Sequence, residues 1–173
     1  DLTLGGPVVT TTGNLVKTGA GNLTLTNPGA NVFGTVNQGL RVNGGTLTLD
    51  GGVAGTQTNA VAGELWLGAT PDVSASLVLN NTSLTTTSWL AMGRGNGSAT
   101  TTLTATNSRI TPANFSTGYN AGHANDSDQN ITLTNTTWTN NGVTLLAESV
   151  NSTTTMVIEG TSVYNARGRF SIG

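Results

Sequence analysis

The side chains with the greatest capacity for chemistry gather in one polar segment, GYNAGHANDSDQN, at residues 118–130. This segment holds the only histidine of the chain, His123, together with Tyr119, Asp126 and Asp128. The two aspartates form an Asp-x-Asp pair, which with backbone carbonyl oxygens could hold Ca²⁺, a cation that prefers oxygen ligands. A hydrated loop with Asx-turns is the other interpretation, and we favour it because a full calcium loop would carry more carboxylates. The sequence therefore predicts a polar loop without a bound metal ion.

The acidic residues give little support for catalysis. Enzymes that cleave polysaccharides need clustered carboxylates, often with a basic partner, on one face of the protein. The eight carboxylates are instead spread along the chain, at Asp1, Asp50, Glu64, Asp72, Asp126, Asp128, Glu148 and Glu159. In the repeat described below, Glu148 has Asn114 and Arg169 nearby in register, but no second acid is evident there. We expect no catalytic residue, no cofactor and no enzymatic activity, and a polysaccharide-active enzyme is kept as an alternative.

The composition favours a β-rich chain with few charges. Only 8% of residues are charged, against about a quarter in ordinary domains, and the formal net charge is −2. Thr and Val are abundant, which indicates β-structure rather than disorder. The six basic residues are scattered, which argues against nucleic acid as a partner. No apolar run approaches the roughly 20 residues of a membrane span. Because the chain has no cysteine, it has no disulfides.

A repeat runs through the whole chain and would position these side chains. Short words such as LVKTG, LWLG and FSIG recur about every 25 residues, with one interval of about 30 that contains residues 118–130. The first residue of each word is apolar and is expected to stack inward as a core ladder: Leu15, Leu40, Leu65, Leu90, Phe115, Leu145 and Phe170. The 30-residue interval predicts a loop insertion, and insertions in repeat proteins often form the binding face.

A second ladder of words lies between the first. It starts at Leu2, Leu23, Leu47, Leu77, Leu103, Ile131 and Met156. In each word the first and third positions are apolar and the second is Thr or Val, as expected for a strand with one buried face. The fifth position is always Gly or Asn, which tolerate a left-handed backbone at a tight corner: Gly6, Asn27, Gly51, Asn81, Asn107, Asn135 and Gly160. A weaker third strand is predicted around Leu84, Ile110, Trp138 and Val163.

Three short strands in about 25 residues predict an all-β fold. We expect a right-handed, single-stranded parallel β-helix of about seven coils, in one domain at residues 1–173, with coils stacked about 4.8 Å apart. An antiparallel sandwich would explain the strand spacing but does not predict a constant period.

Residues 15–52 resemble the autotransporter-associated β-strand repeat of bacterial passenger domains. The first half of that pattern matches Lys17, Thr18, Gly19, Gly21, Leu23 and Leu25, and the second half matches Val42, Asn43, Gly45, Thr46 and Leu47. Residues 65–173 keep the period with divergent words. The resemblance implies a secreted or cell-surface β-helix that acts as a stalk, adhesin or assembly element, and that family has no shared catalytic residues.

The sequence therefore predicts a non-enzymatic structural rod in an extracellular or bacterial cell-surface protein. Both ends of the repeat lack a cap, so we expect the rod to stack end to end with itself in a fibre or to join flanking coils of a longer chain. One alternative is an adhesin that binds a surface glycan or host ligand through residues 119–128. Another is an ice-binding surface on the outward threonines of the second ladder, Thr3, Thr24, Thr48, Thr104 and Thr132.

Overall fold

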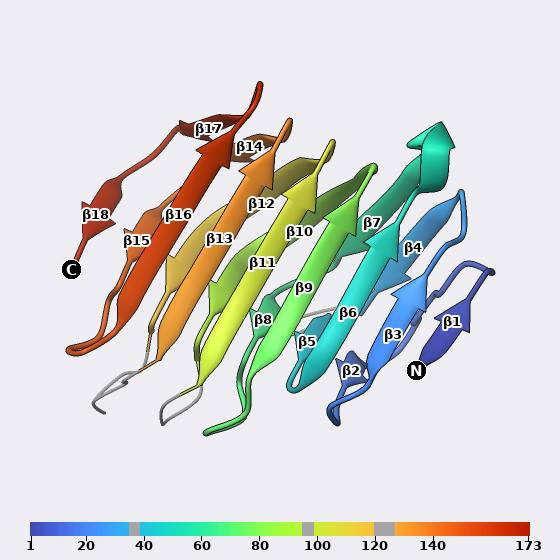
Figure 1. Cartoon of the computed structure of the whole chain (residues 1–173), viewed down its shortest axis with the longest axis horizontal. Coiled ribbons are helices and arrows are strands. Elements are labelled where there is room, and N and C mark those ends of the chain that lie inside the picture. The colour runs from blue at the N-terminus through green and yellow to red at the C-terminus, as the bar shows by residue number, and fades with distance from the viewer. Residues whose placement is uncertain (35–38, 95–98, 120–126) are drawn as a thin grey trace.

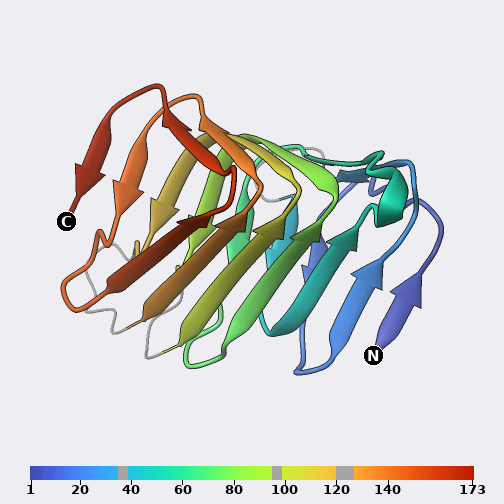
Figure 2. The ribbon, with the colours of Figure 1, turned by 45° about the horizontal axis from the view of Figure 1, so that its top comes forward.

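The computed structural model describes residues 1–34, 39–94, 99–119 and 127–173. Within these residues the chain forms a parallel β-solenoid of about six turns, so the predicted fold is confirmed and the coil count is slightly lower than expected. Every strand pairing in the described ranges is parallel, and the first and last strands lie at opposite ends of the stack (Figure 1). Figure 2 shows how each coil passes from one sheet to the other and back.

One face of the solenoid is a seven-stranded sheet built from the second ladder. Its strands, in stacking order, are β1 (Leu2–Leu4), β3 (Asn22–Leu25), β6 (Gly45–Asp50), β9 (Ala75–Asn80), β11 (Thr100–Thr106), β13 (Asp128–Thr134) and β16 (Thr153–Glu159). The predicted first positions, from Leu2 to Met156, are all in register with one another. Period-two alternation with Leu inside and Thr outside therefore predicted this sheet correctly.

The other two strands of each coil form an eleven-stranded sheet around the opposite corner. The core-ladder words give β2 (Leu15–Lys17), β5 (Leu40–Val42), β8 (Leu65–Leu67), β15 (Thr144–Leu146) and β18 (Phe170–Ile172). The third strands are β4 (Ala30–Phe33), β7 (Gln57–Val61), β14 (Thr137–Asn140) and β17 (Val163–Ala166). In two middle coils both strands merge into one long strand, β10 (Thr82–Met92) and β12 (Arg109–Thr117), with a register irregularity between Thr86 and Trp89. A short 3₁₀ turn, η1 (Gly52–Ala54), precedes β7.

The core ladder differs from the prediction at one coil. Leu15, Leu40, Leu65, Leu90 and Phe115 are in register, but the next place belongs to Thr144, which pairs with Phe115 and Phe170. Leu145 was wrongly assigned to the core and occupies the outward register position. Thr144 is fully buried because its Oγ1 accepts a hydrogen bond from Asn140 Nδ2 at 2.8 Å and bonds Tyr164 Oη at 3.0 Å. Two satisfied hydrogen bonds remove most of the cost of burying the hydroxyl.

The third column of the core changes character along the stack. Near the N-terminus it holds two buried asparagines, with Asn31 Nδ2 donating to Asn59 Oδ1 at 2.8 Å. Further along, the register continues through Leu84, Ile110 and Trp138. The last place belongs to Tyr164 rather than to Val163, which is partly exposed. Tyr164 occupies this place because its ring packs on that of Trp138, with the two ring centroids 5.6 Å apart.

The predicted corner positions divide into two groups. Asn81, Asn107, Asn135 and Gly160 have φ between 48° and 62°, so these four adopt the left-handed backbone. Gly6, Asn27 and Gly51 do not adopt a positive φ, and the prediction was wrong for them. In the coil that carries η1, Gly51 has φ −79° and the next residue, Gly52, takes φ 59°. Asn27 is buried beneath Gln57, whose amide donates to its backbone and side-chain oxygens.

Lys17, the only lysine of the chain, holds two coils together. It is largely buried, and its Nζ donates to the carbonyl oxygens of Thr18, Gly19 and Gly44 at 2.8–2.9 Å. Thr18 and Gly19 belong to one turn and Gly44 to the turn stacked on it. The ammonium group therefore satisfies carbonyl oxygens that would otherwise lack donors, and charge-assisted bonds of this kind are stronger than neutral ones.

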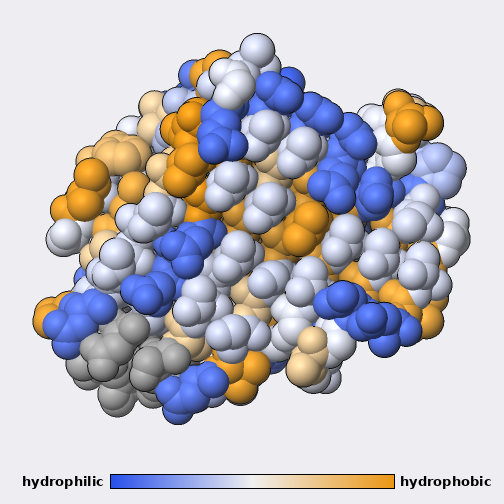
Figure 3. All heavy atoms as spheres, viewed as in Figure 1, coloured by the Kyte–Doolittle hydropathy of each residue, from blue (hydrophilic) through white to orange (hydrophobic). Residues whose placement is uncertain are grey.

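The outward face of the seven-stranded sheet is polar and nearly uncharged. Figure 3 shows it covered mainly by pale side chains of intermediate hydropathy, with scattered hydrophilic and hydrophobic ones. The outward threonines are in register as predicted, and Val78 and Val157 interrupt their column. Among the described residues, no helix has the length and apolar character needed to span a membrane.

Candidate ligand-binding site

The predicted ligand loop is only partly described. His123 and Asp126 lie outside the described residues, whereas Tyr119 and Asp128 lie within them. Asp128 is the exposed first residue of β13 and pairs in register with Thr100 and Thr153. The predicted loop insertion at 118–130 therefore extends too far toward the C-terminus, because residues 128–130 belong to the regular strand β13. In the described part of the chain no three His, Cys, Asp or Glu side chains lie close enough to hold a metal ion.

A pocket lies on the outward face of the eleven-stranded sheet, where β8, β10, β12 and β15 are side by side. The outward places of these strands are filled by Trp66, Ala91, Ser116 and Leu145, which are in register. Two small side chains stand between two large ones, so the surface is hollowed over Ser116. The cavity measures about 190 Å³ and opens to solvent. We call it the Trp89 pocket, and its lining is Glu64, Trp89, Arg94, Ser116, Tyr119, Leu145 and Glu148.

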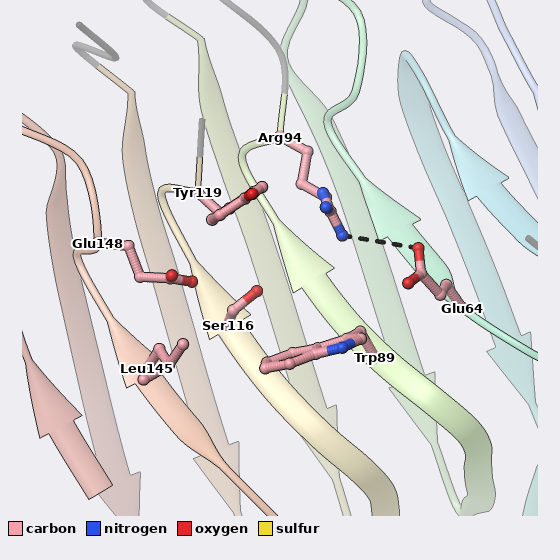
Figure 4. A pocket seen from close by; sticks show the side chains of 7 residues that line it. All are labelled: Glu64, Trp89, Arg94, Ser116, Tyr119, Leu145 and Glu148. Atoms are coloured by element: carbon pink, nitrogen blue, oxygen red, sulfur yellow. Dashed lines mark ion pairs between the residues drawn. The ribbon is translucent and has the colours of Figure 1, made fainter. Parts of the chain in front are cut away.

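The lining side chains come from four coils and converge on one space. Figure 4 shows the Trp89 and Tyr119 rings on opposite sides of the group, with Glu64 and Glu148 at opposite ends. Ser116 points into the space between them. Arg94, Tyr119 and Glu148 each follow a tight turn at the end of a core-ladder strand, which explains their shared position. Gly93, Gly118 and Ala147 precede them with φ of 67°, 66° and 52°.

Arg94 fixes one wall of the Trp89 pocket. Its guanidinium carbon lies 4.7 Å from the ring centroids of both Trp66 and Tyr119, and the guanidinium carbon of Arg41 lies 4.6 Å from the ring centroid of Trp66. Cation–π contacts of this length are attractive. Arg94 Nη1 also forms an ion pair with Glu64 at 3.6 Å, and Trp66 Nε1 donates to the same carboxylate. The wall is therefore held by several contacts without any ligand.

Glu148 is the least satisfied polar group of the pocket. Its Oε1 is buried and has no hydrogen-bond partner among the described residues. Burial raises the pKa of Glu148 above its usual 4.5, and a hydrogen bond with Ser116 and the positive charges of Arg94 and Arg169 oppose this shift only in part. A carboxyl group with a free, partly desolvated oxygen is available to a ligand as a hydrogen-bond partner.

Replacing Glu148 by Gln should stabilise the protein at neutral pH. The folded protein binds the proton of Glu148 more tightly than the unfolded chain, so the ionised carboxylate lowers stability above the raised pKa. This loss disappears as the pH falls through the raised pKa to below 4.5. We therefore expect the urea midpoint of Glu148→Gln to exceed that of the wild type at pH 7 and the two to converge in acid. A variant that is less stable than the wild type at pH 7 would contradict this expectation.

This site was not predicted from the sequence. No second acid was expected near Glu148, whereas Glu64, the residue before β8, lines the same pocket from three coils away, across β10 and β12. Long side chains that reach along the stack bring the two acids to one pocket. Two features of the sequence could have predicted the site. Trp66 occupies an outward position of its strand, and Arg94, Tyr119 and Glu148 each lie just after the turn that ends a core-ladder strand.

Comparison with known proteins gives no relative for this chain: no protein-family model matches it, and neither a curated protein nor a solved structure does.

Proposed function

We propose that this chain is a rigid, non-enzymatic rod module of an extracellular or bacterial cell-surface protein, which stacks end to end with further coils. The observation that supports this proposal is the exposure of core positions at both ends of the stack. Leu2 is 57% exposed, whereas Leu47 and Leu77, in the same column, are fully buried. At the other end Phe170 is 49% and Ile172 69% exposed.

The end strands are also open edges. Among the strands of the described ranges, β1 pairs only with β3, and β16, β17 and β18 pair only with the coil before them. Each therefore presents backbone donors and acceptors beside an exposed apolar row, which is the template on which another strand adds. A head-to-tail contact between copies would continue both sheets and would propagate as a fibre. Flanking coils of a longer chain would make the same contact.

The surface of the rod supports a mechanical role. The buried apolar side chains form one cluster from Leu25 to Trp138, and the outward face of the seven-stranded sheet carries mainly Thr and few charges. A solenoid of this kind gains stiffness from contacts between neighbouring coils. The resemblance of residues 15–52 to the autotransporter-associated repeat supports placing the rod outside the cell.

Sedimentation velocity and negative-stain electron microscopy test the proposal. We expect the wild type to form elongated particles that lengthen with concentration. In Leu4→Lys/Ile172→Lys, a charge at each end would be buried in the stack, so this variant should stay monomeric with an unchanged circular dichroism spectrum. Val53→Lys is the matched control, because Val53 is fully exposed on η1 rather than on an end strand. Wild-type protein that remains monomeric at every concentration would overturn end-to-end stacking.

A further inference from the structure

We propose that the Trp89 pocket binds a neutral sugar ring, as one unit of a glycan chain that lies along the stack. The Trp89 pocket has no described lining residue on the end strands of the rod, whereas the second hollow described below borders the end strand β18. The predicted ligand surface contributes Tyr119 to this pocket, and the other described lining residues lie on or beside β10, β12 and β15, with Glu64 just before β8.

The shape of the pocket suits one pyranose ring. Its 190 Å³ is below the roughly 300–1,000 Å³ of sites for drug-sized ligands. A pyranose ring has an apolar face of C–H groups and an edge of hydroxyls. Trp89 and Tyr119 offer aromatic surfaces to such a face, and Leu145 adds an aliphatic wall. Ser116 and the carboxyl group of Glu148 then face the hydroxyl edge.

The charges of the pocket favour a neutral ligand over an ion. Arg94 is the one cationic residue of the described lining, and it is already paired with Glu64 at 3.6 Å and stacked between two rings. A phosphate group would lie beside the carboxyl group of Glu148, and the positive charge of Arg94 is already paired with Glu64. A cationic ligand would compete with Arg94 for the same aromatic faces. Sugar hydroxyls both donate and accept, so they match a lining that mixes carboxyl, hydroxyl and guanidinium groups.

A second hollow extends the site along the stack. It is lined by Leu145, Leu146, Glu148, Arg169, Ser171 and Gly173, and thus shares Leu145 and Glu148 with the Trp89 pocket. Glu148 stands between the two hollows, where its unpartnered Oε1 could bond a hydroxyl of either ring. The two adjoining hollows point to an oligosaccharide rather than a free monosaccharide as the ligand.

The site is formed before any ligand binds. Arg94 holds Tyr119 and Trp66 by cation–π contacts, and Arg41 holds Trp66 from the neighbouring coil. The floor is a strand of a continuous parallel sheet, so little of the backbone has to become ordered on binding. Pre-organisation of this kind lowers the entropic cost of association.

Isothermal titration calorimetry tests the proposal with defined probes. Glucose and N-acetylglucosamine represent single neutral rings, and cellotetraose and tetra-N-acetylchitotetraose represent the corresponding chains. We expect at least one single ring to bind with a Kd on the order of millimolar. The corresponding tetrasaccharide should bind about tenfold more tightly. Arg169→Ala should weaken binding of the tetrasaccharide but not of the single ring, because Arg169 lines the second hollow and not the Trp89 pocket.

Substitutions in the pocket provide the decisive comparison. Tyr119→Ala removes an aromatic wall and Ser116→Leu fills the cavity, and each should reduce sugar affinity at least tenfold. Thr132→Leu makes a similar small-to-large change outward on β13, in the other sheet, and should bind as the wild type does. If Ser116→Leu fails the circular dichroism check, Tyr119→Ala decides the result. Absence of sugar binding, sugar affinity unchanged in these variants, or saturable binding of inorganic phosphate or choline instead would overturn the proposal.

Discussion

Replacing Trp138 by Ala is expected to destabilise the protein by about 4 kcal/mol, within the range for truncating a buried aromatic side chain. Trp138 is fully buried and is among the largest side chains of the core. Its ring centroid lies 4.6 Å from that of Phe115 and 5.6 Å from that of Tyr164, and Tyr164 continues to Phe170 at 6.5 Å. Removing it would leave a cavity in the middle of this aromatic row. Urea unfolding followed by far-UV circular dichroism measures the loss.

Trp138→Phe is the matched control. Nε1 of Trp138 is buried without a hydrogen-bond partner in the described part of the chain. Phe removes this unsatisfied donor and keeps a ring against Phe115, so we expect a loss of about 1 kcal/mol. A loss of only about 1 kcal/mol for Trp138→Ala as well would show that the aromatic row contributes less than its burial indicates.

Gly45→Ala is expected to cost about 3–4 kcal/mol, far more than the same change at Gly52. Both glycines have a positive φ, 64° and 59°, so each alanine would meet a similar backbone penalty of about 1–2 kcal/mol. At Gly45 a methyl group would also lie 2.5 Å from the carbonyl oxygen of Gly19 and against that of Gly21, in the coil below. At Gly52 nothing lies within 4 Å of that position.

The difference between the two variants isolates the contact between coils. Urea midpoints of Gly45→Ala and Gly52→Ala, measured in parallel, should differ by about 2 kcal/mol in unfolding free energy, which is within the range for overpacking. Similar midpoints would mean that the turn at residues 19–21 moves aside, and that the two coils are less tightly stacked there than the distances indicate.

The fold was predictable because the stacking of coils repeats the same demand in each. Leu47, Thr48 and Leu49 alternate inward and outward as Leu23, Thr24 and Leu25 do, and the register follows directly. Prediction failed where local hydrogen bonding or ring packing overruled hydrophobicity. Thr144 took the inward place from Leu145 because Asn140 and Tyr164 satisfy its hydroxyl. No pattern of apolar residues contains that information.

The candidate site was harder to predict because it is assembled from outward positions. Trp66, Trp89 and Arg94 look like ordinary surface residues one at a time, and their contacts depend on side-chain direction across several coils. The loop at residues 118–130 attracted attention through its composition, and its Tyr119 does line the pocket. A search for side chains that share an outward column, rather than for clusters along the chain, would have found Arg94, Tyr119 and Glu148 together.

The buried asparagines of the third column also determine which coils can stack on each other. Asn59 is held by Asn31 below it and by Thr82 and Ser83 above it, so both faces of its amide have matching neighbours only at this level of the stack. If the coil of Leu84 were left out of the stack, the amide of Asn59 would face Ile110 and lose these partners. If the coil of Asn59 were left out, Leu84 would cover Asn31. A single buried polar residue fixes register in coiled coils in the same way. The leucine columns alone would allow one coil to stack on several others. These amides favour the stacking order in which Asn59 lies between Asn31 and Thr82.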